Sequence, residues 1–251
     1  MFLPLPTMNP ILIAAAVIPA VFLLLRIYRA DRLDKEPTQL LAGLVLMGII
    51  STSLAMLTER LGTFVIGLAL FEGSFLYDVL LYFLVVGLSE EGFKYLLLRV
   101  RTWNNPHFNC QFDAVVYATF VSLGFALWEN ISYVASYGLG TALVRAVTAV
   151  PGHACFGVFM GAFYGVAKKY DNAGQKDSAK TYRTLAVVVP VLLHGTYDFI
   201  AASQSVHSAW AFAVFVGIMF YVACRLVKKM AATDRYIDGQ QHLDDLWNFG
   251  Q

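Results

Sequence analysis

Seven apolar stretches, each long enough to cross a lipid bilayer as a helix, constrain this 251-residue chain more than any other feature. The hydrocarbon core of a bilayer takes about 20 helical residues. Hydrophobic residues make up 58% of the chain and charged residues only 14%, whereas soluble proteins average about 25% charged residues. The sequence therefore predicts an all-α, polytopic membrane bundle of about seven transmembrane helices. They are expected at residues 11–28, 39–58, 74–99, 112–137, 141–167, 184–203 and 208–227.

The remaining segments favour a single membrane domain, because the connections between the stretches are short. Residues 62–72 are apolar but too short to span, so we expect an interfacial or re-entrant piece there. The N-terminus lacks the basic region and the cleavage site of a signal peptide, so the first stretch is expected to remain as a span. We expect one transmembrane domain over residues 1–229 and a cytoplasmic tail over residues 230–251 that forms a short helix without chemistry.

Positive charge predicts the orientation, because short cytoplasmic loops carry an excess of Lys and Arg. With the N-terminus outside and the C-terminus inside, fifteen of the 18 Lys and Arg residues lie on the inner side. Of the other three, Arg60 and Arg145 fall outside and Lys94 lies within a predicted span. The asymmetry also supports the number of spans, since losing one would scramble the pattern.

Charge and cysteine spacing exclude several classes of protein. The formal net charge is +1, and there is no finger-like Cys/His spacing or basic–aromatic pattern, so a nucleic-acid partner is not expected. The three cysteines, Cys110, Cys155 and Cys224, are far apart and indicate neither a disulfide framework nor a zinc ribbon.

Polar side chains inside the predicted spans are the candidates for function, because charge at membrane depth is costly and usually marks a pathway or a reactive site. They come from four different spans, which predicts a site at the centre of the bundle. The residues are Glu90, Glu91, Lys94, Glu129, Asn130, His153, His194 and Asp198. Asp113, at the start of the 112–137 stretch, is interpreted as a helix-start acid favoured by the helix dipole.

Helical spacing places some of these residues on shared faces. Lys94 lies one turn from both Glu90 and Glu91, so an internal pair neutralises one glutamate and leaves the other protonated, metal-bound or paired with another helix. His194 and Asp198 are four apart, as in a metal-binding pair or an imidazole oriented by its acid. Glu129, with Asn130 beside it, is interpreted as structural or functional with equal weight.

His153 begins a series at spacing four with three glycines, Gly157, Gly161 and Gly165. Small residues at this spacing let a neighbouring helix approach closely, so His153 is expected to face protein rather than lipid. Counting 1.5 Å per residue from the predicted cytoplasmic ends leaves His153 and Glu90 about 10 Å apart along the membrane normal.

Four sequence motifs occur in order on four successive predicted spans: EEGFKY (90–95), FDAVVYATFVSLGFALWEN (112–130), PGHACFGVFMGAFYG (151–165) and LLHGTYDF (192–199). They resemble the PrsW family of intramembrane proteases, which is similar to the CAAX prenyl-protease-like membrane peptidases. The resemblance covers about residues 74–203. Two residues depart from the wider CAAX-like pattern: Lys94 stands where arginine is common, and Asp198 where asparagine is common.

The resemblance implies a multi-pass enzyme of the bacterial inner membrane that cleaves a single-pass membrane protein, typically an anti-sigma factor of a stress pathway. By the same resemblance, Glu90 and Glu91 match the paired glutamates, His153 the histidine of the next motif, and His194 with Asp198 the last motif. Lys94, Glu129 and Asn130 are expected to support them.

Peptide hydrolysis needs an activated water, a group that stabilises the oxyanion and a proton for the leaving amine. In the scheme that we favour, no metal takes part: Glu90 is the general base, His153 positions the water, and His194 is an oxyanion donor oriented by Asp198. In the alternative, a zinc ion is held by two histidines and a carboxylate with one open position. Its candidate ligands are His153, His194, Glu90 and Asp198.

Two other classes of protein remain as alternatives. Chains of Glu, Asp and His in membranes also serve as proton relays in coupled transporters, although the spans here lack paired Gly/Pro breaks in two halves. A noncatalytic scaffold that binds helices through the glycine face is the third reading.

Overall fold

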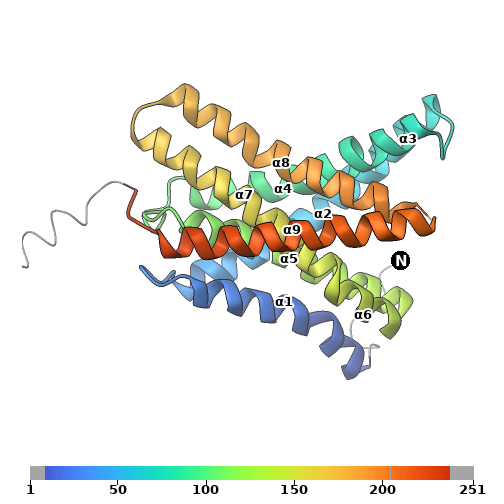
Figure 1. Cartoon of the computed structure of the whole chain (residues 1–251), viewed down its shortest axis with the longest axis horizontal. Coiled ribbons are helices and arrows are strands. Elements are labelled where there is room, and N and C mark those ends of the chain that lie inside the picture. The colour runs from blue at the N-terminus through green and yellow to red at the C-terminus, as the bar shows by residue number, and fades with distance from the viewer. Residues whose placement is uncertain (1–8, 204, 238–251) are drawn as a thin grey trace, which may run out of the picture.

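The computed structural model describes residues 9–203 and 205–237. Within them the regular elements are all helices, and the only β-type pairing is a single antiparallel one between Cys110 and Tyr236 (Figure 1). The helices run in chain order as α1 Pro10–Ala30, α2 Thr38–Ala69, α3 Phe75–Val79, the π-helix η2 Leu80–Gly87, α4 Leu88–Thr102, α5 Asp113–Tyr137, α6 Leu139–Val147, α7 Ala149–Asn172, α8 Lys176–Ala202 and α9 Val206–Ala232.

The predicted polytopic all-α bundle is confirmed. Six helical segments are long and apolar enough to span a membrane, namely α1, α2, α5, α6 with α7, α8 and α9. The remaining predicted span, residues 74–99, corresponds to α3, η2 and α4, which follow one another without a gap. Every predicted span therefore corresponds to helix.

The prediction of a separate segment at residues 62–72 is wrong. Residues 62–69 are the last turns of α2, whose 32 residues give a length of about 48 Å, more than the hydrocarbon core needs. The helix continues because Glu59, Arg60 and Leu61 all favour helix. Gly62 then lets η2 pack closely, since a Cβ there would lie 2.7 Å from Val85 Cγ1.

The stretch predicted at residues 141–167 divides into α6 and α7. The break falls at Thr148, whose φ of −120° and ψ of −74° are not helical. Pro151 lies in the first turn of α7, where a missing backbone N–H breaks no helical hydrogen bond. The sequence between residues 148 and 151 is therefore suited to start a new helix, and α6 lies as a short separate helix beside it.

Helix α5 forms the centre of the bundle and packs against α1, α2 and α7. Its contact with α7 follows the predicted glycine face: a Cβ on Gly161 would lie 2.5 Å from Ala114 O. Its contact with α2 is equally close, since a Cβ on Gly48 would lie 2.1 Å from Val121 O. Backbone-to-backbone packing on two sides explains why α5 is buried over most of its length.

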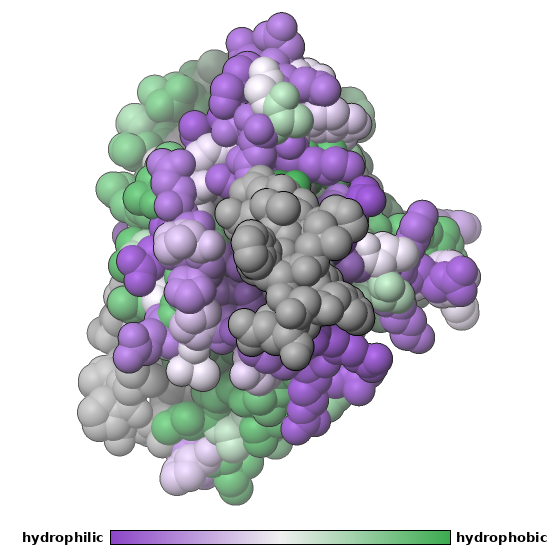
Figure 2. Space-filling model, turned by 90° about the vertical axis from the view of Figure 1, so that its left-hand side faces the viewer, coloured by the Kyte–Doolittle hydropathy of each residue, from purple (hydrophilic) through white to green (hydrophobic). Residues whose placement is uncertain are grey.

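The α1–α2, α4–α5 and α7–α8 connections and the end of α9 lie at one end of the bundle, on the left in Figure 1. Seen from this end, hydrophilic residues gather in the middle and hydrophobic residues along the flanks (Figure 2). After α9, residues 233–237 are not helical. They pair with the α4–α5 connection, where Ile237 N donates to Asn109 O at 2.6 Å and Gln111 N to Arg235 O at 3.2 Å. The rest of the predicted tail helix lies outside the described residues.

Candidate active site

Helix α4 presents its polar residues to the bundle in its first turns, directly after the π-helix η2. Close packing against α8 fixes this register: a Cβ on Gly195 would lie 2.5 Å from Phe83 Cδ1, and a Cβ on Gly87 would lie 3.2 Å from Val191 O. A π-helical turn changes the face that the following residues present. The glutamates of α4 therefore point toward α8 and α7.

Lys94 is the centre of the polar cluster and is fully buried. Its Nζ lies 2.7 Å from Glu91 Oε1, 3.2 Å from Glu90 Oε2 and 3.2 Å from His153 Nδ1. It also lies 3.8 Å from the centre of the Phe125 ring, a distance at which the ring face stabilises a cation. The lysine thus contacts both glutamates.

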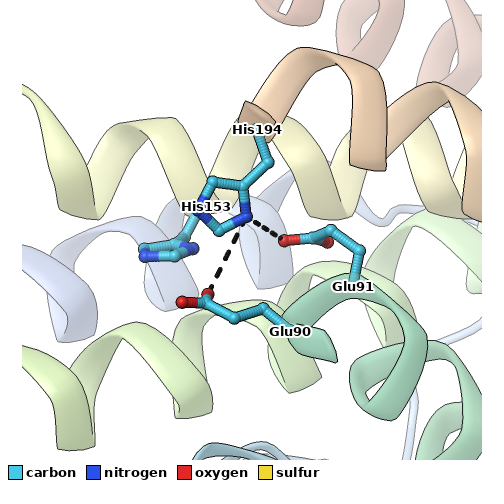
Figure 3. Close-up of side chains that lie close together, drawn as sticks. All are labelled: Glu90, Glu91, His153 and His194. Carbon is cyan, nitrogen blue, oxygen red and sulfur yellow. Dashed lines mark hydrogen bonds and ion pairs between the residues drawn. The ribbon is translucent and has the colours of Figure 1, made fainter. Parts of the chain in front are cut away.

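His194 joins α8 to α4. Its Nδ1 lies 2.9 Å from Glu91 Oε1 and 3.8 Å from Glu90 Oε2, as the dashed lines in Figure 3 show. Its Nε2 lies 3.3 Å from Asp198 Oδ2, so the predicted His–Asp pair exists. The imidazole is stacked on Phe156 at 4.8 Å between ring centres. Carboxylates on both sides and an aromatic face hold the ring in one orientation.

His153 joins α7 to α5. Its Nε2 lies 2.9 Å from Glu129 Oε2, and the same oxygen accepts from Arg145 Nη2 of α6 at 2.9 Å. Asn130 accepts from Arg145 Nε at 2.9 Å and donates to the backbone oxygen of Ala16 at 2.7 Å. Glu129 therefore contacts a candidate site residue directly, whereas Asn130 ties α5 to α1 and α6.

A cavity of about 430 Å³ opens beside these residues. Its walls include Glu90, His153, His194 and Asp198, but Glu91 is not among the lining residues. Glu91 is 0% exposed and Glu90 is 6% exposed. Of the two adjacent glutamates, Glu90 is the one that a water or a substrate in the cavity can reach.

Comparison with known proteins identifies the chain. A family model described as PrsW family intramembrane metalloprotease matches residues 36–224. The chain belongs to the PrsW family. It is 34% identical over 227 residues to Protease PrsW of Bacillus subtilis (strain 168), covering 87% of this chain and 94% of that relative. It is 36% identical over 191 residues to Protease PrsW of Clostridioides difficile (strain 630), covering 74% and 76%. No solved structure matches.

Membership of the PrsW family confirms the resemblance seen in the motifs and makes the chain an intramembrane peptidase. Together with the six candidate spans, it also confirms a multi-pass membrane protein, which in bacteria resides in the cell membrane. The transporter and scaffold readings have no support from these relatives.

The five residues predicted to be catalytic meet in one place, although they come from α4, α7 and α8. The predicted 10 Å offset between His153 and Glu90 is wrong, since both contact Lys94. The counting assumed that the helices end at one level. In the structure α7 continues through polar residues to Asn172, beyond the predicted end of this span at residue 167.

Two charged residues near the PrsW site were missed from sequence. Glu59 of α2 lines the same cavity as Glu90. It was not counted among the polar residues inside spans, because the predicted span ended at residue 58. Arg145 was placed in an outer segment, yet it lies on α6 and bonds Glu129. The sequence signal that could have found Glu59 is the helix-favouring run that continues through it. No local sequence signal marks Arg145.

The PrsW family description raises a metal, and the donor types suit one. Glu90, Glu91, His153 and His194 each offer a ligand atom, and these four atoms lie within 4.8 Å of one another. Two imidazoles with carboxylates are a zinc-like donor set, and Glu91 Oε2 is buried without a hydrogen-bond partner. Asp198, named among the candidate ligands, is not part of this group.

The space between these donor atoms is already filled by the side chain of Lys94, which argues against a metal there. Lys94 Nζ lies within 3.2 Å of Glu90, Glu91 and His153, so an ammonium occupies the position from which a metal would bind them. Two cations at such a range repel strongly in a buried site. The residues therefore fit a metal in type but not in this arrangement, and Lys94 would have to move away.

Proposed function

We propose that this PrsW-family peptidase hydrolyses its substrate with a water activated by Glu90, without a metal. One observation carries the proposal: Glu90, His153, His194 and Asp198 face the same cavity, while Lys94 supplies the compensating positive charge behind them. A carboxylate at the wall of a cavity is placed to accept a proton from water.

In the proposed reaction the water oxygen attacks the peptide carbonyl carbon while Glu90 takes its proton. His153 positions the water by lining the cavity beside it, and its ring is held through Nε2 by Glu129 and through Nδ1 by Lys94. In this scheme His194 is an imidazolium: its Nδ1–H donates to Glu91, and its Nε2–H, near Asp198, donates to the oxyanion. Glu90 then passes the proton to the leaving nitrogen as the C–N bond breaks, which returns the site to its starting state.

The proposed substrate is a single-pass membrane protein, with an anti-sigma-factor-like protein as the specific candidate. Support comes from membership of the PrsW family and from the place of the site, where α4 meets α7 and α8, two helices of candidate membrane spans. A peptide bond can reach such a site only when the substrate segment itself enters the membrane.

The test is a cleavage assay with the purified full-length protein and a tagged single-pass substrate. We expect Glu90→Gln to abolish product formation, because glutamine cannot accept the proton. Glu91→Gln should lower the rate and also the thermal stability, because it removes the buried partner of Lys94 and His194. Asp177→Asn, on an exposed part of α8, is the control. Full activity of Glu90→Gln would overturn the proposal.

A zinc-dependent version of the same protease is the second candidate, favoured by the four grouped donors and by the family description. His153, His194 and a glutamate of α4 would hold the ion, which would polarise the attacking water. Elemental analysis of purified protein, combined with cleavage with and without chelator, separates the two candidates. Stoichiometric zinc that is lost together with activity would replace the metal-free scheme.

A further inference from the structure

A second group of carboxylates lies far from the site, at the end of the bundle that holds the α1–α2 and α4–α5 connections. Three members belong to the α1–α2 connection, one begins α5 and one follows α9. We call them the loop acidic cluster: Asp31, Asp34, Glu36, Asp113 and Asp234. They act on one another electrostatically across these three segments.

Several oxygens of the loop acidic cluster are buried with nothing to bind. Asp31 is 1% exposed, and neither of its carboxylate oxygens has a hydrogen-bond partner. Glu36 Oε2, Asp113 Oδ1 and Asp234 Oδ2 are likewise buried and unpartnered, as is the amide oxygen of Asn109. Buried polar atoms are almost always bonded, so this many unpartnered acceptors in one place are suited to a positively charged ligand.

The protein does not supply that charge itself. Among the described residues, no ion pair includes a member of the loop acidic cluster. Lys35 is the adjacent cation, but its Nζ donates to the backbone oxygens of Tyr28 and Asp31, and it lies over the Tyr28 ring. The carboxylate of Asp31 is therefore left without a direct partner, and the neighbours of Glu36, Tyr117 and Asp113, bring no positive charge.

We propose that the loop acidic cluster binds one divalent cation of the magnesium class, partly through water. All the free atoms are carboxylate or amide oxygens, which hard cations prefer. Of the described residues, only the group around Glu90 and His153 brings three ligand atoms within 4.8 Å. The loop acidic cluster would therefore touch the ion through one or two oxygens and the rest through water. Mg²⁺ keeps several waters in this way, whereas Ca²⁺ takes six to eight oxygens.

The surroundings of the cluster are already held in place. Asp113 Oδ2 accepts from Cys110 N at 2.6 Å and from Asn109 N at 3.1 Å. Asp234 Oδ1 accepts from Phe112 N at 2.9 Å, and Asn109 Nδ2 donates to Asp34 Oδ2 at 3.0 Å. Asp113 and Asp234 thus each have one fixed oxygen and one free oxygen, whereas both oxygens of Asp31 are free. A bound ion would join the α1–α2 connection, the start of α5 and the segment after α9.

Binding is tested with Mn²⁺, which shares the oxygen preference of Mg²⁺ and whose free form is counted by electron paramagnetic resonance. We expect the full-length protein to take up one ion per chain in a saturable manner and Mg²⁺ to compete for it. Asp31→Asn should weaken this uptake at least tenfold, with Asp234→Asn as a second variant. Glu90→Gln, which removes a carboxylate from the membrane site, should leave the uptake unchanged.

Three outcomes would overturn the proposal: no saturable uptake by the unaltered protein, unchanged uptake by both aspartate variants, or uptake that is lost in Glu90→Gln. Thermal unfolding gives an independent readout, since a ligand that binds only the folded state raises Tm. MgCl₂ should raise Tm more than NaCl of equal ionic strength, and this difference should vanish in Asp31→Asn. An equal effect of both salts would show screening and would also overturn the proposal.

Discussion

The site around Lys94 and the loop acidic cluster each gather several carboxylates, but only the first contains its own cation. Lys94 contacts Glu90 and Glu91, whereas no Lys or Arg among the described residues pairs with Asp31. The difference follows from the source of positive charge that is available to each group of carboxylates. Inside the helical spans the protein must provide the compensating charge, while at the end of the bundle the aqueous phase can provide an ion.

The largest effect should come from breaking this compensation in the membrane site. Lys94→Met leaves Glu90 and Glu91 buried without a cation, and removing one partner of a buried pair costs about 3–5 kcal/mol. We expect a strong loss of thermal stability and no measurable cleavage. Lys35→Met is the matched control, because that ammonium bonds only backbone oxygens.

The alternative substitution Lys94→Arg keeps the charge and should recover part of both stability and cleavage. Unfolding followed by circular dichroism and a cleavage assay measure the two effects. If Lys94→Met were as stable as Lys35→Met, the glutamates would not depend on the lysine, and the contrast between the two carboxylate groups would disappear.

A smaller effect is expected where the membrane site uses a carboxylate to position a histidine. Glu129 Oε2 lies 2.9 Å from His153 Nε2. The loss of a carboxylate that orients a metal-ligating histidine typically costs about 10–100-fold in activity. By analogy, we expect Glu129→Gln to lower kcat by about 10–100-fold with little change in KM. Asn130→Ala, which loses the bond to Ala16, should lower Tm more than kcat. The reverse pattern would make Glu129 merely structural.

Much of the fold and of the site could be predicted because the signals are local. Hydropathy alone predicts seven spans, and the cost of charge at membrane depth marks Glu90, His153 and His194 as candidates. The glycine series after His153 also predicted which face of that helix packs closely, and Gly161 against Ala114 confirms it.

The rest depends on how distant segments meet. Arg145 reaches Glu129 only because α6 folds back beside α5. Asp31 and Asp234 look like ordinary loop charges in the sequence, since more than 200 positions separate them, and only the packed bundle brings them into range of one another. A hydropathy pattern does not tell which distant segments lie side by side, so the loop acidic cluster could not be predicted.

The loop acidic cluster should also respond to pH, by a few degrees in Tm. Burial raises the pKa of Asp31 to about 6 and that of Glu36 to about 7. The folded state therefore holds protons more tightly than the unfolded state, so stability is full below about pH 4 and falls as pH rises toward 7. Unfolding in chelator measures this slope, and Asp31→Asn should flatten it. A stability that rises over this range in Asp31→Asn and the unaltered protein alike would contradict the stated cause.

The smallest effect is expected at Glu59, the carboxylate that lines the cavity without joining the site. It shares the cavity wall with Glu90, but no hydrogen bond or ion pair connects it to Lys94, His153 or His194 among the described contacts. Glu59→Gln should therefore change kcat/KM less than tenfold, mainly through KM, because the residue lines the cavity that a substrate enters and acts on Lys94 and His194 only through its charge. A loss of kcat comparable to that of Glu129→Gln would show that Glu59 takes part in the reaction, and the site around Lys94 would then include α2.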